Sequence, residues 1–204
     1  MNLAEKYNKI YSDNKVTFGR GKPEKVVKDI LKYKKSGTVL ELGAGEGRNS
    51  IFLAKQGFNV RAIDISNEGI NKIKTFVKDK IFQIQTEVMD ITSIRFENNH
   101  DVFISTFVFH HLSSSDALNL IDNIQKHTNL GGLNVVVVFM KNGAFYKADP
   151  LTKNFFPQLN QLRTLYKEWE ILEYEERESE AFQKNLDGSA VFNMVATILA
   201  RKNL

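Results

Sequence analysis

Three glycines at alternate positions follow a short apolar run and precede a helical pattern, and this order constrains the fold more than any other feature. The run covers residues 38–42, the glycines are Gly43, Gly45 and Gly47, and the helical pattern starts at Asn49. The order predicts a strand, a tight turn and a helix. Glycine permits backbone conformations that side chains forbid, and the first helical turn presents free amides. We therefore expect a cradle for a nucleotide cofactor.

An acidic residue closes the second apolar run. The run covers residues 58–63 and is followed by Asp64, which lies 21 residues beyond Gly43. A carboxylate there can accept hydrogen bonds from both hydroxyls of a ribose. Nicotinamide-binding proteins place such an acid about 20 residues after a G-x-G-x-x-G loop, but here the third glycine comes one residue earlier. This spacing favours a cofactor other than a nicotinamide dinucleotide. The alternative without any cofactor is that the glycines form an ordinary turn and Asp64 caps a helix beginning near Asn67.

The motif Glu41-x-Gly43-x-Gly45-x-Gly47 resembles the first motif of class I S-adenosylmethionine-dependent methyltransferases. The resemblance implies S-adenosylmethionine as cofactor and S-adenosylhomocysteine as product. It implies that the glycine loop lies against the methionine part, that Asp64 holds the ribose, and that an acid after a third apolar run at residues 81–85 contacts the adenine. The implied cofactor contacts are Glu41, Gly43, Ala44, Gly45, Gly47, Arg48, Asn49, Asp64, Ile65, Asp90, Ile91, Ser105 and Thr106.

Strand and helix patterns alternate from Thr38 to Phe139, which predicts a parallel sheet with right-handed crossovers and a ligand site at the carboxyl ends of its strands. A fourth apolar run covers residues 101–112, and a glycine turn at residues 130–133 precedes a fifth strand at 134–139. A helix is expected near residues 158–166. Residues 169–177 and 190–200 predict an antiparallel hairpin with its turn at 186–189.

The resemblance places this pattern in the α/β class, as a three-layer, Rossmann-like class I methyltransferase fold. The sheet is expected to be mostly parallel and seven-stranded, with an antiparallel C-terminal edge hairpin. We expect one globular domain overall. Residues 1–36 are predicted to form an N-terminal helical cap or lid, and residues 37–204 the S-adenosylmethionine-binding domain.

The C-terminal part narrows the resemblance to the tellurite-resistance methyltransferases of the TehB type. The similar segments are 45–50, 155–156, 161–166, 169–174 and 196–202. This resemblance implies a chalcogen oxyanion, such as tellurite or selenite, as the methyl acceptor. Some of these relatives carry a His-Arg pair suited to an oxyanion where this chain has Phe182-Gln183, which cannot make the same charge-assisted hydrogen bonds. The cations that could replace the pair are Arg20, Lys22, Lys141 and Lys147.

Two adjacent histidines, His110 and His111, end the fourth apolar run and are the catalytic candidates. A soft anionic acceptor needs no general base, whereas a neutral hydroxyl or amine acceptor needs one near the methyl group. The alternative is that one histidine packs and the other is solvated. The predicted acceptor pocket consists of Tyr7, Tyr11, Arg20, Phe109, Phe145 and Tyr146.

The aromatic N-terminal segment has two interpretations. Tyr7, Tyr11 and residues 18–21 form either a lid over the acceptor or a frayed amphipathic helix packed on the sheet. Chain termini are poorly ordered unless other elements hold them, so the sequence leaves both interpretations open.

Composition excludes several classes of protein. The chain has 204 residues and no cysteine, so disulfides and a thiolate nucleophile are absent. Four histidines, two of them adjacent, do not favour a zinc site, and no metal is expected. The net charge of +4 is unevenly distributed along the chain. Residues 1–35 hold ten Lys or Arg and four Asp or Glu, whereas residues 168–180 hold seven Glu and one Arg. A solvated basic helix at residues 23–35 explains this better than nucleic-acid binding.

No apolar run approaches the roughly 20 residues that a membrane-spanning helix needs, and the polar N-terminus does not resemble a signal peptide. We expect a cytoplasmic protein, a monomer or weak homodimer, with a small-molecule substrate and no nucleic-acid or membrane partner. The predicted function is methyl transfer from S-adenosylmethionine to a small acceptor, for which the family resemblance implies an oxyanion of the tellurite or selenite type. The alternatives are a small organic thiol, amine or hydroxyl acceptor, a nicotinamide-dependent oxidoreductase, and a non-catalytic S-adenosylmethionine-binding sensor.

Overall fold

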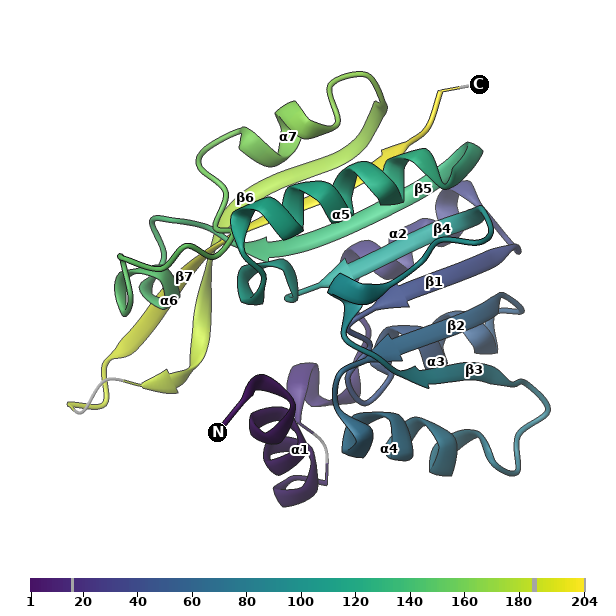
Figure 1. Ribbon diagram of the computed structural model, residues 1–204, viewed down its shortest axis with the longest axis horizontal. Helices are drawn as coiled ribbons and strands as arrows, with labels where there is room; N and C mark the ends of the chain where they lie inside the picture. The colour runs from purple at the N-terminus through teal and green to yellow at the C-terminus, as the bar shows by residue number, and fades with distance from the viewer. Residues whose placement is uncertain (16, 185–186, 204) are drawn as a thin grey trace.

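A seven-stranded sheet forms the centre of the computed structural model, which describes residues 1–15, 17–184 and 187–203. Its strands are β1 (Thr38–Leu42), β2 (Asn59–Asp64), β3 (Ile84–Val88), β4 (His100–Thr106), β5 (Thr128–Phe139), β6 (Glu170–Lys184) and β7 (Ala190–Arg201). They follow the order β3-β2-β1-β4-β5-β7-β6 (Figure 1). The first five are parallel, and β7 is antiparallel to β5 and β6. The predicted mostly parallel sheet with its antiparallel edge hairpin is confirmed.

Helices cover both faces of this sheet, which gives three layers (Figure 1). The helices are α1 (Leu3–Asp13), α2 (Lys25–Tyr33), α3 (Arg48–Lys55), α4 (Asn67–Val77), α5 (Ser114–Lys126), α6 (Ala144–Lys147) and α7 (Gln161–Leu165). Short 3-10 turns are η1 (Phe18–Gly21), η2 (Ile91–Ser93) and η3 (Phe109–His111). One core cluster joins the sheet to α2, α3 and α4, and the second joins it to α5 and α7.

The alternation of side chains along each strand produces the two clusters. In β1, Val39 belongs to the cluster beneath α2, α3 and α4, whereas Leu40 and Leu42 belong to the cluster beneath α5 and α7. All three side chains are buried. Because successive strand residues point to opposite faces, a strand buried on both faces is apolar along its length. This explains why β1, β4 and β5 read as continuous apolar runs.

Helix α2, which belongs to the predicted N-terminal cap at residues 1–36, packs into the core. Val26, Val27 and Ile30 of α2 are 5%, 0% and 0% exposed and pack into the core with β1. This packing makes α2 part of the central domain, with its lysines on the outer face as the basic-helix interpretation expected. Only α1 and η1 remain outside it, and α1 lies beyond the carboxyl ends of β1 and β2 (Figure 1).

The limits of the third and sixth strands differ from the sequence prediction. The third strand begins at Ile84 instead of residue 81, because Ile81 is fully exposed and lies in the loop after α4. β6 extends to residue 184 instead of 177, because its backbone continues to pair with β7 beyond the end of β5. Pairing with a neighbouring strand decides where these strands begin and end, and the local hydrophobic pattern does not show where that pairing occurs.

The glycines at residues 131 and 132 lie inside β5 and form no turn before it. The ladder between β4 and β5 shifts register between His100 and Val102, opposite the start of β5. Gly131 has φ 69°, and a Cβ on Gly132 would lie 2.6 Å from a Thr128 side-chain atom. A bulge at this point requires glycine, so the two glycines mark an irregular strand.

Asp101 ties the first strand to the fourth and fifth. Its carboxylate accepts hydrogen bonds from the Thr38 backbone N–H at 2.9 Å and from Asn129 Nδ2 at 3.2 Å. Lys34 Nζ lies 3.5 Å from it. Burial raises the pKa of Asp101, but these hydrogen bonds and Lys34 outweigh burial and leave the pKa below its usual value. A Cβ at residue 37 would lie 2.6 Å from the same carboxylate, so glycine is required there.

We expect Asp101→Ala to lower the free energy of unfolding by about 2 kcal/mol at neutral pH, because the Thr38 amide loses its partner. A lowered pKa stabilises the folded state above the unfolded pKa, and the contribution disappears as the pH falls through the folded pKa. Urea titrations at pH 7 and pH 3 should therefore show a smaller gap between variant and wild type at pH 3. Asp79→Ala, at an exposed aspartate, is the control, and an equal gap at both pH values would contradict the role of the carboxylate.

Candidate functional site

The glycine loop after β1 adopts a conformation that side chains rarely reach. Gly43, Gly45 and Gly47 have φ values of 74°, 57° and 82°. The backbone N–H groups of Gly43 and Ala44 donate to the Ile63 carbonyl at 2.8 and 2.9 Å, which fixes the loop against the end of β2. Left-handed backbone geometry favours glycine, so the motif is explained first by the turn itself.

Neighbouring side chains fill the space that these glycines leave. A Cβ on Gly43 would lie 2.2 Å from a methyl group of Val108, and one on Gly45 would lie 2.4 Å from the Tyr11 hydroxyl. The loop is thus packed between η3 and α1. A cofactor that follows the loop would meet residues of both elements, because they stand directly over the glycines.

Asp64 organises the loop from the end of β2. One carboxylate oxygen accepts from Gly45 N at 2.7 Å and the other from Ser66 N at 2.8 Å. The side chain is 7% exposed, and burial raises the pKa of Asp64 against the effect of these two hydrogen bonds. Ser66, whose Oγ accepts from Gly69 N at 3.1 Å, caps α4. The alternative that Asp64 caps this helix is therefore wrong.

A buried polar network lies beneath the loop. Glu41, 1% exposed, accepts from Asn49 Nδ2 at 2.8 Å and from Ser50 Oγ at 2.5 Å. Asn49 Nδ2 also donates to Thr106 Oγ1 at 3.1 Å. The network joins the ends of β1 and β4 to the first turn of α3. Burial raises the pKa of Glu41 to about 7, although its two donors act in the opposite direction.

The raised pKa gives Glu41 a measurable signature. Because the folded state binds the proton more tightly than the unfolded chain, stability is full below the usual pKa of 4.5 and falls as the pH rises through about 7. The loss amounts to at most about 3 kcal/mol. We expect Glu41→Gln, which cannot titrate, to lose less stability than wild type between pH 5 and pH 8 in urea titrations. Glu97→Gln, at an exposed residue, serves as control, and parallel pH profiles would refute the assignment.

Helix α1 covers the glycine loop and the end of β2. Asn8 Oδ1 accepts from Ser66 Oγ at 2.7 Å and from the Glu68 backbone at 3.2 Å. Tyr11 is 5% exposed, and its hydroxyl lies over Gly45. Burial, with the negative charge of Asp64 as a further cause, raises the pKa of Tyr7 to about 12. The tyrosines of α1 therefore stand close to the predicted ribose-binding carboxylate.

His110 packs in an aromatic cluster that consists of His110, His111, Phe139, Phe145 and Phe156. Its ring centroid lies 4.1 Å from that of His111, 4.7 Å from Phe139 and 5.1 Å from Phe145. The side chain is 3% exposed, and its Nδ1 has no hydrogen-bond partner among the described residues. Burial, and then the neighbouring His111 and Lys6, hold the pKa of His110 well below its usual range.

His111 lies between this cluster and α1. Its Nε2 is 2.7 Å from the Tyr7 hydroxyl. Burial and then Lys6 lower the pKa of His111 to about 4. Both imidazoles are consequently uncharged at neutral pH. The alternative interpretation expected one histidine to be packed and the other solvated, but His111, the less buried of the two, is hydrogen bonded to Tyr7 of α1.

The remaining predicted contacts occupy varied environments. Asp90 is exposed and caps η2, accepting from Thr92 N at 2.9 Å. Ile91 is buried in the second core cluster, and Ile65 follows Asp64 at the end of β2. Ser105 is 2% exposed, and its Oγ lacks a partner among the described residues. The Arg48 guanidinium pairs with Glu24 at 2.6 Å.

The predicted acceptor pocket is brought together only in part. Phe145 stacks on Phe139 with centroids 5.2 Å apart, and the Tyr146 ring lies 5.3 Å from Phe156. Phe109 is different, because it is 1% exposed and packs in the core beneath α5 and α7, where an acceptor cannot reach it. Lys22, Lys141 and Lys147 are exposed. The side chains of Arg20, Phe182 and Gln183 lie outside the described residues.

The sequence reasoning missed several residues that hold the site in place. Asn8 anchors α1, Val108 packs on Gly43, and Ser66 caps α4. Asn193 of β7 is 7% exposed and accepts from the Phe145 backbone N–H at 2.7 Å, which fixes the loop that carries Phe145. A serine directly before a helical pattern signals a cap. The other three act across the fold and leave no local signal.

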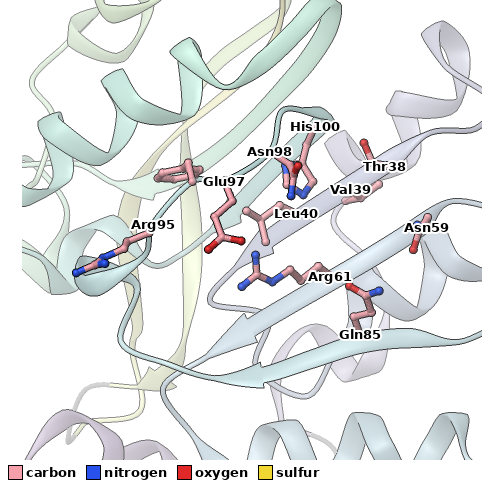
Figure 2. A pocket seen from close by; sticks show the side chains of 11 residues that line it. Thr38, Val39, Leu40, Asn59, Arg61, Gln85, Arg95, Glu97, Asn98 and His100 are labelled. Carbon is pink, nitrogen blue, oxygen red and sulfur yellow. The ribbon is translucent and has the colours of Figure 1, made fainter.

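A cleft of about 230 Å³ lies elsewhere, at the amino-terminal halves of β1, β2 and β3 (Figure 2). Thr38, Arg61 and Gln85 line it together with residues 95–98 and His100. None of the predicted site residues contributes to it, and Arg61 is paired with Glu87 at 2.6 Å. The described residues contain no cluster of three or more His, Asp or Glu that could hold a metal ion. None of the described helices is both long and apolar enough to span a membrane.

The sheet order, the strand ends and the glycine loop define the class I methyltransferase fold. The family model described as "Tellurite resistance protein TehB" matches residues 5–199, and the chain belongs to this family. A Haemophilus influenzae protein (strain 10810), described as a probable S-adenosyl-L-methionine-dependent methyltransferase TehB, is 35% identical over 164 residues. That match covers 80% of this chain and 57% of the relative, so the chain spans little more than half the length of this curated relative.

Solved structures agree with this assignment. The crystal structure of TehB from Haemophilus influenzae has a TM-score of 0.81 and 31% identity, and the match covers 97% of this chain and 67% of the other. The N-methyltransferase NodS from Bradyrhizobium japonicum WM9, solved with S-adenosyl-L-homocysteine, has a TM-score of 0.68. The two chains are 15% identical, and the match covers 99% of each, so this likeness shows only that they share a fold. The family prediction is confirmed, and S-adenosylmethionine is the cofactor that the family indicates.

Proposed function

We propose that this chain transfers a methyl group from S-adenosylmethionine to a small-molecule acceptor. One observation carries the proposal: the glycine loop, Asp64 and the aromatic cluster with its two neutral histidines meet at the carboxyl ends of the parallel strands. Ligands of open α/β sheets bind at this edge. The tight glycine turn and the buried carboxylate fit a nucleoside cofactor without a pyrophosphate, which favours S-adenosylmethionine over a nicotinamide dinucleotide.

Each part of the site has a distinct task in this proposal. Asp64 would accept the ribose hydroxyls, Asp90 the adenine amino group, and the loop at Gly43 and Gly45 would adjoin the methionine part. The bound cofactor supplies an activated methyl group on a sulfonium. The chain contributes binding, orientation and the exclusion of water, and such effects lower a barrier by several kcal/mol. Tyr7, Tyr11 and η1 act as the lid.

The acceptor side combines aromatic rings with uncharged imidazoles. The family name supports a tellurite-type oxyanion, which reacts without a general base. The aromatic cluster supports a second candidate, a small organic acceptor such as a thiol, because burying a hydrated oxyanion without charged partners is costly. Lys6 Nζ lies 5.9 Å from the centre of the Tyr7 ring and is exposed.

A cytoplasmic location, a monomeric or weakly dimeric state and the absence of a nucleic-acid partner are also part of this proposal.

Loss of Asp64 should weaken the cofactor site specifically. Asp64→Ala removes both the predicted ribose contact and the acceptor that holds the Gly45 amide. We expect the Kd for S-adenosylhomocysteine, measured by calorimetry, to rise at least thirty-fold, which corresponds to about 2 kcal/mol. Asp79→Ala should bind like wild type. Wild-type affinity of Asp64→Ala, with an unchanged melting temperature, would remove Asp64 from the cofactor site.

Incubation with defined acceptors tests the reaction itself. Purified protein is supplied with S-adenosylmethionine and, separately, tellurite, selenite or members of a panel of small thiols, amines and hydroxyl acids. Formation of S-adenosylhomocysteine is then measured. Turnover on the oxyanions would establish the first candidate despite Phe182-Gln183, and turnover on an organic acceptor alone would establish the second. Cofactor binding without any turnover, together with a stable protein partner, would support the sensor alternative.

A further inference from the structure

We propose that Tyr7 is a positioning residue whose hydrogen bond to His111 locks α1 over the cofactor cradle and couples cofactor retention to the acceptor side. This inference rests on the proposed function, because it assumes that the cofactor binds at the glycine loop. It assigns Tyr7 a task beyond lining a pocket, since the hydroxyl would act on the cofactor through the position of a helix.

The contact joins two segments that are 104 residues apart in the sequence. The Tyr7 hydroxyl lies 2.7 Å from His111 Nε2, and the two rings meet edge to face with centroids 5.5 Å apart. His111 in turn contacts His110 at 4.1 Å, and His110 is enclosed by the rest of the aromatic cluster. Through His111, Tyr7 is therefore in contact with the aromatic cluster.

The same face of α1 is anchored on the cofactor side. Asn8 is bonded to Ser66 and to the Glu68 backbone, and Tyr11 lies over Gly45. Tyr7, Asn8 and Tyr11 follow a helical spacing that places them on neighbouring positions of one face. One short helix thus touches the end of β2 at one point and η3 at another, and bridges the two halves of the site.

Access to the cradle requires this bridge to open. Ser66 is 0% exposed and Asp64 is 7% exposed with α1 in place. Asn2 and Glu5 form a capping box, but α1 has only 11 residues, and helices of this length are marginal without tertiary contacts. Its closed position therefore depends on a few side-chain contacts, of which the Tyr7–His111 hydrogen bond is the one that reaches the acceptor side.

The charges around the contact allow a neutral hydrogen bond. The groups that face it are Lys6 from α1, His110 from η3 and Asp64 from β2. With the pKa of Tyr7 raised to about 12 and that of His111 lowered to about 4, the phenol and the imidazole are both uncharged near pH 7. A neutral hydrogen bond contributes about 1 kcal/mol, so removing it should change a dissociation rate about five-fold.

A double-mutant cycle on the full chain tests the coupling, with S-adenosylhomocysteine as the probe. We expect Tyr7→Phe to raise its dissociation rate, measured by stopped-flow displacement, about five-fold. In a His111→Leu background the same change should have no effect, because the partner is already absent. His111→Gln, whose amide can still bond to Tyr7, should restore most of the sensitivity.

Two controls separate coupling from general damage. Tyr33→Phe changes an exposed tyrosine of α2 and should leave the rate unchanged. Hydrogen exchange in the S-adenosylhomocysteine complex should speed up in residues 3–13 of Tyr7→Phe but not in α5. A wild-type rate for Tyr7→Phe, or an equal effect in both His111 backgrounds, would overturn the inference alone. Failure of the wild-type chain to bind S-adenosylhomocysteine would overturn the proposed function as well.

Discussion

The carboxylate of Asp64 holds the amides of Gly45 and Ser66 at 2.7 and 2.8 Å, and the arrangement of the functional edge depends on this pair of hydrogen bonds. One bond fixes the glycine loop, and the other fixes the residue that caps α4. Asn8 then bonds to Ser66 and places α1. A buried carboxylate requires such partners, because an unpaired charge in the interior is costly. Asp64, the predicted ribose-binding acid, thus also holds the loop and the start of α4 in place.

Aromatic packing governs the other half of the site. The rings around His110 keep both imidazoles in an environment of low polarity, and their pKa values fall because the charged form loses its hydration. Tyr7 joins this half to α1 through a neutral contact with His111, and Asn193 of β7 accepts a hydrogen bond from the Phe145 backbone. This aromatic cluster and its supports therefore come from segments far apart in the sequence, including α1, η3, β5, α6 and β7.

The separation of two contacting residues along the chain explains which parts of the site could be predicted from the sequence. The glycine loop and the position of Asp64 follow from a local motif, and the alternation of strands and helices follows from the period of the apolar runs. The seven-stranded sheet with its edge hairpin was predictable only through the family resemblance. The Tyr7–His111 contact spans 104 residues and the Asn193 contact 48, and no local pattern encodes either. Phe109 packs in the core beneath α5 and α7, because a position shortly after a strand does not show which face a side chain takes. Strand limits at Ile84 and in β5 depended on pairing and on a bulge.

The separation of the two halves bears on how the substrate specificity of such a chain can change. The cofactor half uses the ends of β1 and β2, where a shift would disturb the core clusters on both faces. The proposed acceptor half would use the loop that carries Phe145, which Asn193 holds, and the part of the β6–β7 hairpin that extends beyond β5. Changes there leave the sheet intact, since specificity resides in segments attached to a rigid scaffold. If the proposed acceptor half is correct, Phe182-Gln183 in place of a His-Arg pair would change the acceptor and leave the cofactor site and the fold the same.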